Sequence, residues 1–212
     1  MERIEYRGIV DKSEWPRGEW DQEPDKIQWQ DEATGLPCLI VRGPVGALCG
    51  YVGVPSGHPL HGKDYDNVSL EAHGGITFAS GCAKVGDRAK WELWKQRLLA
   101  RRGEAKTYPR GDAARYLKEW ADGLESYEAW AERCEARSVC HRVPPGEPDD
   151  IWWFGFDCAH AGDFTPAYER SEKLGAPTGW GSFVEYRNLD YVSAECRELA
   201  KQLAAISAQS TE

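Results

Sequence analysis

The segment Ile151-Trp-Trp-Phe-Gly-Phe-Asp157 is strongly apolar and has the length of a buried β-strand. A Pro-rich linker, 143–150, leads into it, and the polar loop 158–166 follows it. The segment 75–79, GITFA, comes at the end of a series of strand-like segments that begins near the N-terminus. We predict that 75–79 pairs with 151–157, so that the late segment joins a sheet begun by the first third of the chain.

The first third of the chain consists of short strand-like segments separated by turn residues. Several of them alternate apolar and polar side chains, and a Thr-Gly turn at 34–35 predicts a hairpin between two of them. Short strands with frequent turn signals favour a mainly antiparallel sheet. The segments are 3–10, 26–31, 36–42, 47–54, 68–72 and 73–80.

Two regions have helical periodicity. Aromatic and apolar residues recur three and four apart over about 88–137, which predicts a helical insertion within 84–140. The C-terminal segment opens with Asn188, a typical N-cap residue, and then places Val192, Cys196, Leu199, Leu203 and Ile206 on one helix face. We therefore predict a single α+β domain over 1–212: a mainly antiparallel sheet, the insertion, and a C-terminal amphipathic helix packed on the sheet.

Composition disfavours several classes of protein. Hydrophobic residues make up 41% of the 212 residues, which is enough for a folded core, and the net charge of −9 argues against general nucleic-acid binding. No apolar run approaches the roughly 20 residues that a membrane helix needs. The N-terminus lacks the basic start and apolar stretch of a signal peptide. We expect a cytoplasmic protein with no membrane partner.

The seven cysteines are widely spaced and form no CxxC pair. Without an export signal, this pattern predicts no disulfide framework and no zinc finger. We expect Cys38, Cys49 and Cys196 to be small apolar core residues.

Charge is distributed unevenly along the chain. Residues 84–118 contain eleven Lys or Arg against four acids, a net +7, which leaves −16 for the rest. Such a stretch can attract an anionic ligand or an acidic partner. The alternative is a solvated helical face packed against an acidic body.

Four of the five histidines lie in three short motifs at predicted strand ends, with Gly or Ala beside them. Loops at strand ends often present functional side chains. We predict that the three motifs meet in one pocket lined by His58, His61, His73, Asp157, His160 and Asp163, with Lys63, Asp64 and Trp153 as further ligand contacts.

These residue types fit three kinds of chemistry. Neutral imidazoles and carboxylates are ligands for a divalent transition metal, they transfer protons near neutral pH, and they hydrogen-bond polar ligands. A purely structural alternative is that the histidines cap strands while Asp157 or Asp163 bonds local backbone amides. A Cys158/His160 dyad is a further alternative, although no residue that would orient the imidazole is evident.

Several blocks of the sequence resemble those of a widespread family of uncharacterised phage, prophage and bacterial proteins: EPDKIQW, TGLPCLIVR, LCGYVGVPSGHPLHGKDYD, HGGITFA, GEPDDIWWFGFDCAHAGD and YRNLDYVSAECRELAKQL. The resemblance covers most of the chain except the helical middle, and the GFDCAHAGD block is its most specific part. It implies a small intracellular protein of phage origin, located in the host-cell cytoplasm. Proteins of that kind often disarm host defences, some by sequestering nucleotide-type signals.

Three functions are hypotheses at this point. The first is a non-catalytic protein that captures a small, polar, anionic ligand, a nucleotide-derived signal, with no cofactor. The second is a metal-dependent hydrolase in which the six His and Asp residues supply ligands for a divalent transition metal. The third is an inhibitor that docks on a host protein. The Trp-rich insertion also offers a surface for homo-oligomerisation.

Overall fold

The computed structural model describes residues 3–82, 92, 138–143, 146, 150–167 and 184–209. Contacts divide the chain into two units, one formed by Met1–Ala83 with Arg137–Glu212 and the other by Lys84–Ala136. The second unit coincides with the predicted insertion. The helices predicted for this region and the basic stretch 84–118 lie outside the described residues, apart from Glu92. The described strands and the C-terminal helix belong to the first unit.

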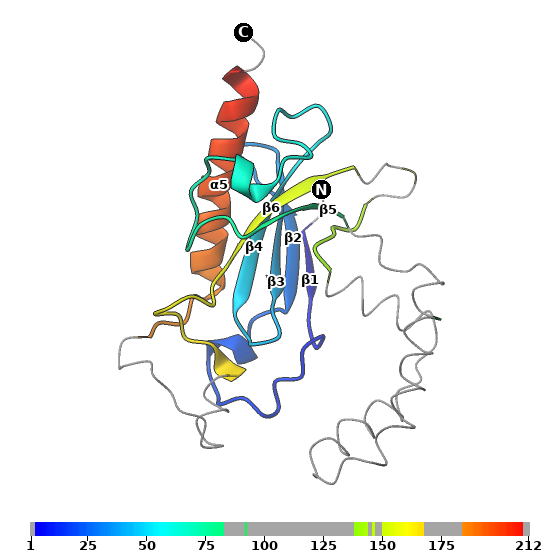
Figure 1. Cartoon of the computed structure of the whole chain (residues 1–212). Helices are drawn as coiled ribbons and strands as arrows, with labels where there is room; N and C mark the ends of the chain where they lie inside the picture. The colour runs from blue at the N-terminus through cyan, green and yellow to red at the C-terminus, as the bar shows by residue number, and fades with distance from the viewer. Residues whose placement is uncertain are drawn as a thin grey trace. The chain divides into compact units, whose positions relative to one another are not determined.

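Six antiparallel strands form one sheet with the order β1-β2-β3-β4-β6-β5 (Figure 1). The sheet, together with the C-terminal helix that packs on it, confirms the predicted α+β fold. The short strands β1 and β5 are its edges. The strands are β1 Ile4–Tyr6, β2 Lys26–Gln30, β3 Pro37–Arg42, β4 Leu48–Val54, β5 Phe78–Gly81 and β6 Trp152–Asp157.

Strand β6 is inserted between β4 and β5. Gly155 lies opposite Tyr51 of β4 on one side and Phe78 of β5 on the other. The predicted pairing of 75–79 with 151–157 is therefore confirmed. Because β5 and β6 are antiparallel, the residues that precede β5 lie beside those that follow β6. This register brings His73 toward the loop that contains His160 and Asp163.

The helix α5, Leu189–Gln209, covers one face of the sheet (Figure 1). The side chain of Asn188 accepts a hydrogen bond from the Tyr191 amide at 3.1 Å, so the predicted N-cap is confirmed. Among the described residues, no helix has the length and apolar content needed to cross a bilayer. The helix and the sheet enclose a core that includes Ile40, Val52, Phe154, Phe156, Val192, Cys196, Leu199 and Leu203.

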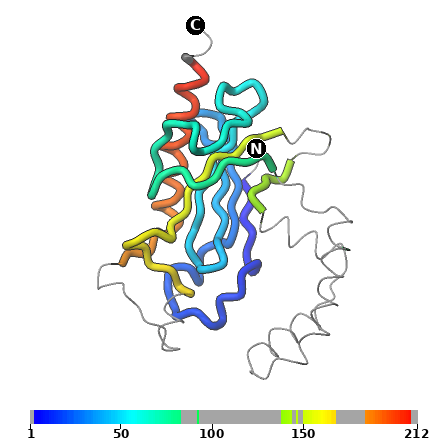
Figure 2. The backbone as a smooth tube through the Cα atoms, viewed as in Figure 1, coloured from blue at the N-terminus to red at the C-terminus, as the bar shows by residue number. Residues whose placement is uncertain are grey.

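Residues 68–72, expected as a strand, are instead an irregular segment beside α5 (Figure 2). The Gln202 side chain accepts from the Glu71 amide and donates to the Glu71 carbonyl, both at 2.8 Å. The Glu195 carboxylate accepts from the His73 amide at 2.9 Å. These side chains satisfy backbone groups that a neighbouring strand would otherwise satisfy. The segment thus delivers His73 to the N-terminal half of α5.

The segment 138–143 contacts polar side chains of β2. Lys26 Nζ donates to the carbonyl of Cys140 at 2.7 Å, and the Gln28 side chain bonds the backbone of Arg142. Cys140 forms a disulfide with Cys82, which directly follows β5. The expectation of no disulfide is wrong for this pair, because the fold brings together two residues 58 apart in sequence, which their spacing does not reveal. Cys38 and Cys196 are core residues, as predicted, whereas Cys49 is only partly buried and lies outside the core cluster.

A buried charge network fixes the chain just before α5. The Arg42 side chain is fully buried and bonds Glu23, Asp25 and the hydroxyl of Tyr186. Burial alone would raise the pKa of Asp25, but Lys12 and the amide of Val10 hold this pKa below its usual value. Glu23 also accepts from the Tyr186 hydroxyl and from the first amide of α5. The network therefore sets where the helix starts.

Candidate metal centre

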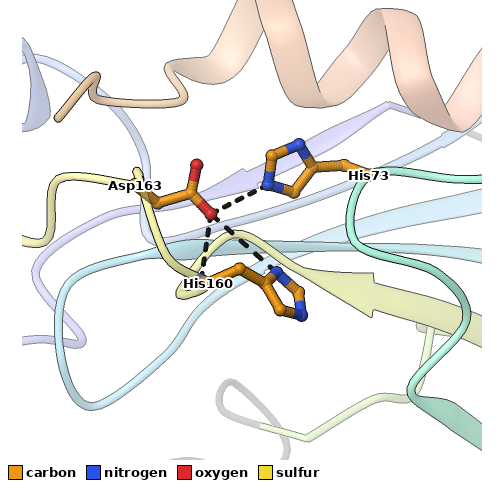
Figure 3. Close-up of side chains that lie close together, drawn as sticks. All are labelled: His73, His160 and Asp163. Carbon is orange, nitrogen blue, oxygen red and sulfur yellow. Dashed lines mark hydrogen bonds and ion pairs between the residues drawn. The ribbon is translucent and has the colours of Figure 1, made fainter. Parts of the chain in front are cut away.

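Two imidazoles and one carboxylate converge beside the C-terminal end of β6 (Figure 3). His73 Nε2 lies 2.8 Å from Asp163 Oδ2, and His160 Nδ1 lies 3.9 Å from the same oxygen. One ligand atom from each of the three residues lies within 4.8 Å of the other two. Two nitrogen or oxygen ligands of one zinc-like ion are at most about 4.4 Å apart, so small side-chain rotations suffice for a shared ion.

The loop after β6 shapes one half of this cluster. The Asp163 amide donates to the His160 carbonyl, and the Asp163 carboxylate accepts from the His160 amide, both at 3.0 Å. Gly162 has a φ of 96°, a conformation that favours glycine and closes the turn. A parallel bridge to Glu185 then ties the loop to the segment before α5. The loop is held from both sides.

Asp163 is the buried centre of the cluster, with 2% of its side chain exposed. Arg187 Nε donates to Oδ1 at 3.0 Å while His73 bonds Oδ2. Burial alone would raise the pKa of Asp163, but His73, Arg187 and the His160 amide together lower it. The carboxylate is therefore ionised at neutral pH, which a metal ligand requires.

His73 is oriented by α5. Its Nδ1 lies 2.9 Å from the Tyr191 hydroxyl, while its Nε2 faces Asp163. Burial, followed by the charge of Glu195, raises the pKa of Tyr191, so the phenol keeps its proton. An outer partner on one ring nitrogen with the other nitrogen facing inward is the usual arrangement of a metal-binding histidine.

The Nδ1 atom of His160 is the strongest indication of a bound ion. This atom is buried and has no hydrogen-bond partner within the described part of the chain, yet it lies 3.9 Å from both Asp163 Oδ2 and Asp157 Oδ1. Buried polar atoms are nearly always bonded, so this nitrogen indicates a missing partner. A cation between the imidazole and the carboxylates would supply that partner.

Gly74 makes room for His160. A Cβ at Gly74 would collide with the His160 ring, whereas a Cβ at Gly75 would have nothing within 4 Å. Both glycines have a positive φ, 67° and 91°. An alanine at either position therefore carries a similar backbone cost, but only one of the two displaces the imidazole.

We predict that Gly74→Ala separates His160 from Asp163 and weakens metal binding by about 10-fold or more, an effect of the size seen when groups that orient ligands are lost. Gly75→Ala is the matched control and should bind as the wild type does. Titration calorimetry with Zn²⁺ or Mn²⁺ measures both variants. Equal affinity of the two variants would show that the position of His160 is irrelevant to binding.

The motif that contains His58 and His61 does not join the cluster. His58 bonds the carbonyl of Leu203 through Nε2 and accepts from the Leu60 amide at Nδ1, so it is a buried imidazole with a partner on each ring nitrogen. Leu203 is twelve residues beyond Tyr191, about 18 Å along the helix. His61 bonds the carbonyl of Asp150, which precedes β6, whereas the cluster lies after β6. The predicted meeting of all three motifs is therefore wrong for the first.

The remaining predicted contacts also lie apart from the cluster. The Lys63 carbonyl accepts from the Trp152 indole, and Asp64 caps a 3₁₀ turn, Tyr65–Asn67. Trp153 is fully buried, so its ring offers no stacking surface to a ligand. The Cys158 thiol is buried as well, and burial followed by the nearby charge of Asp163 raises its pKa, which argues against a Cys158/His160 dyad.

Three residues that support the cluster were missed by sequence reasoning. Tyr191 and Arg187 lie within or just before a segment whose clearest pattern is the apolar face of α5. Thr77, which donates to Asp157 Oδ2 at 3.0 Å, precedes β5. Arg187 and Tyr191 lie close to the N-cap residue Asn188, and Thr77 lies close to His73. This proximity in sequence is the signal that could have identified them.

Comparison of the chain with family models, curated proteins and solved structures found no match.

Proposed function

We propose that this protein binds a divalent transition-metal ion through His73, His160 and Asp163 and uses it as a hydrolase acting on a polar substrate. The observation that supports the proposal best is the unbonded, buried Nδ1 of His160 beside an ionised carboxylate and a second imidazole. Three protein ligands that leave a coordination position open are typical of catalytic rather than structural sites.

The surroundings support chemistry at this position. His160 is about one third exposed as a side chain while its Nδ1 and Asp163 are buried, so the ligand atoms are held on the protein side of a ring that reaches solvent. A metal ion there polarises a substrate oxygen and activates water. Tyr191 and Arg187 would keep His73 and Asp163 oriented toward the ion.

Capture of an anionic ligand without turnover is the second candidate, since the same open position would accept a phosphate or carboxylate oxygen. Neither Trp153 nor the basic stretch 84–118 adds support for a nucleotide at the cluster. Trp153 is buried, and the basic stretch 84–118 is almost wholly outside the described residues. The inhibitor hypothesis concerns that same region and stays a prediction.

We predict that purified protein binds about one equivalent of Zn²⁺, Mn²⁺ or Fe²⁺, and that His73→Ala lowers the affinity by more than about 100-fold, beyond the loss that an outer-shell change causes. Elemental analysis and titration calorimetry measure this. The matched control is His61→Ala, which removes an imidazole bonded only to a remote carbonyl among its described contacts.

Turnover is tested on the metal-loaded protein with bis(p-nitrophenyl) phosphate and p-nitrophenyl acetate. Release of p-nitrophenol by the wild type and by His61→Ala, but not by His73→Ala, is the expected result. A wild-type protein that takes up no ion would contradict the proposal. A protein that binds one ion but hydrolyses neither probe would favour capture.

A further inference from the structure

We propose that Asp157 is a fourth ligand of the same ion and that Thr77 positions it. The inference rests on the proposed metal site and extends its ligand set. The unbonded His160 Nδ1 has two carboxylate oxygens nearby. Asp157 Oδ1 and Asp163 Oδ2 are equally far from that nitrogen, each at 3.9 Å. An ion bound to His160 Nδ1 therefore has two carboxylate oxygens at the same distance from its nitrogen ligand.

The spacing suits ligation better than direct bonding. At 3.9 Å, Asp157 and His160 are too far apart for a hydrogen bond. Two atoms that each bind one ion at about 2.0–2.2 Å are separated by roughly 3–4.4 Å. The distance between the imidazole and Asp157 falls inside that range. Asp157 is not among the three residues whose ligand atoms all lie within 4.8 Å of one another, so its carboxylate has to rotate toward the ion to join them.

Two hydrogen bonds orient the Asp157 carboxylate. Thr77 Oγ1 donates to Oδ2 at 3.0 Å, and the Ala159 amide donates to Oδ1 at 3.1 Å. Metal-binding carboxylates usually accept such outer hydrogen bonds. The side chain is 35% exposed, which leaves it room to rotate about its own bonds. Its place as the last residue of β6 fixes the backbone from which it rotates.

The ligand set defines the class of ion. Two neutral imidazoles and two carboxylates cancel the charge of a divalent cation and supply two nitrogen and two oxygen donors. A tetrahedral ion such as Zn²⁺ would be fully enclosed by these four donors. A six-coordinate ion such as Mn²⁺ or Fe²⁺ would keep two positions for water or substrate. The inferred ion is therefore of the six-coordinate class.

The experiment is a Mn²⁺ titration of the full chain. Binding is measured by calorimetry and by the electron paramagnetic resonance signal of free Mn²⁺. Asp157→Asn should weaken Mn²⁺ binding by more than about 100-fold, and Thr77→Val by about 10-fold, since loss of an outer partner costs about 10–100-fold and loss of a ligand costs more. Asp150→Asn is the matched control at the opposite end of β6 and should bind as the wild type does.

Thermal unfolding of each variant separates ligation from a merely structural role, because a structural residue would lower the melting temperature without changing Mn²⁺ affinity in the folded protein. Asp157→Glu, which keeps the carboxylate, should recover part of the affinity. If the wild type binds one ion and Asp157→Asn binds it equally well, the fourth ligand is overturned while the three-residue site stands. If the wild type binds neither Mn²⁺ nor Zn²⁺, the site itself fails.

Discussion

Replacement of Arg42 by methionine is expected to destabilise the protein by about 3–5 kcal/mol, the cost of removing one partner from a buried ion pair. The Arg42 side chain has no exposed surface, and it bonds the carboxylates of Glu23 and Asp25. Without it, these two acids are buried with only part of their charge compensated. Lys12 still contacts Asp25, but no other cation contacts Glu23 among the described residues. Urea unfolding followed by tryptophan fluorescence measures the loss.

The same change should disturb the proposed metal site from a distance. Arg42 holds the Tyr186 hydroxyl, and the next residue, Arg187, orients Asp163. Variant protein that remains folded should therefore bind the ion more weakly than the wild type. Arg17→Met is the control, since Arg17 is 90% exposed and its pair with Asp21 is screened by solvent. Unchanged stability of Arg42→Met would contradict the assignment of this network as a stabilising element.

Loss of the Cys82–Cys140 disulfide should cost about 4 kcal/mol. The bond closes a loop of about 58 residues, and the chain-entropy relation gives a stabilisation of that size for such a loop. The double variant Cys82→Ser/Cys140→Ser should show the loss in urea unfolding. Since total stability is typically about 5–15 kcal/mol, the effect is a large fraction of it.

A reductant provides the internal control for this prediction. Dithiothreitol should destabilise the wild type toward the level of the double variant and should leave the double variant itself unchanged. A wild type that is indifferent to reductant would contradict the prediction. Stable disulfides are rare in reducing compartments, so the redox state of this pair in the cell decides how much of the stabilisation is present.

Local patterns were sufficient to predict the fold because strand periodicity and helix periodicity are carried by neighbouring residues. The apolar segment 151–157 has few alternatives to a central strand, and 75–79 has the matching length. The N-cap at Asn188 could also be predicted, because Asn is a preferred residue at that position. The segment 68–72 was misassigned because its backbone bonds go to Gln202 and Glu195, more than 120 residues away, and no local pattern reports such partners.

The candidate site was predictable only where it followed from strand pairing. Once β5 and β6 are antiparallel neighbours, His73 must lie near the loop that contains His160 and Asp163. The motif of His58 and His61 looks similar in sequence, but it follows β4 and ends at the opposite end of β6. Tyr191 and Arg187 join the site through the position of α5 on the sheet, which depends on tertiary packing.

The order of the strands also bears on how copies of this protein meet. Among the described strands, the two outermost, β1 and β5, have three and four residues, while the four between them have five to seven. An outer strand exposes unpaired amides and carbonyls that another chain can extend into a continuous sheet, and such growth leads to aggregates. Only a short ladder could form at either margin of this sheet. Association through the described part of this sheet would therefore rely on side-chain contacts more than on strand addition.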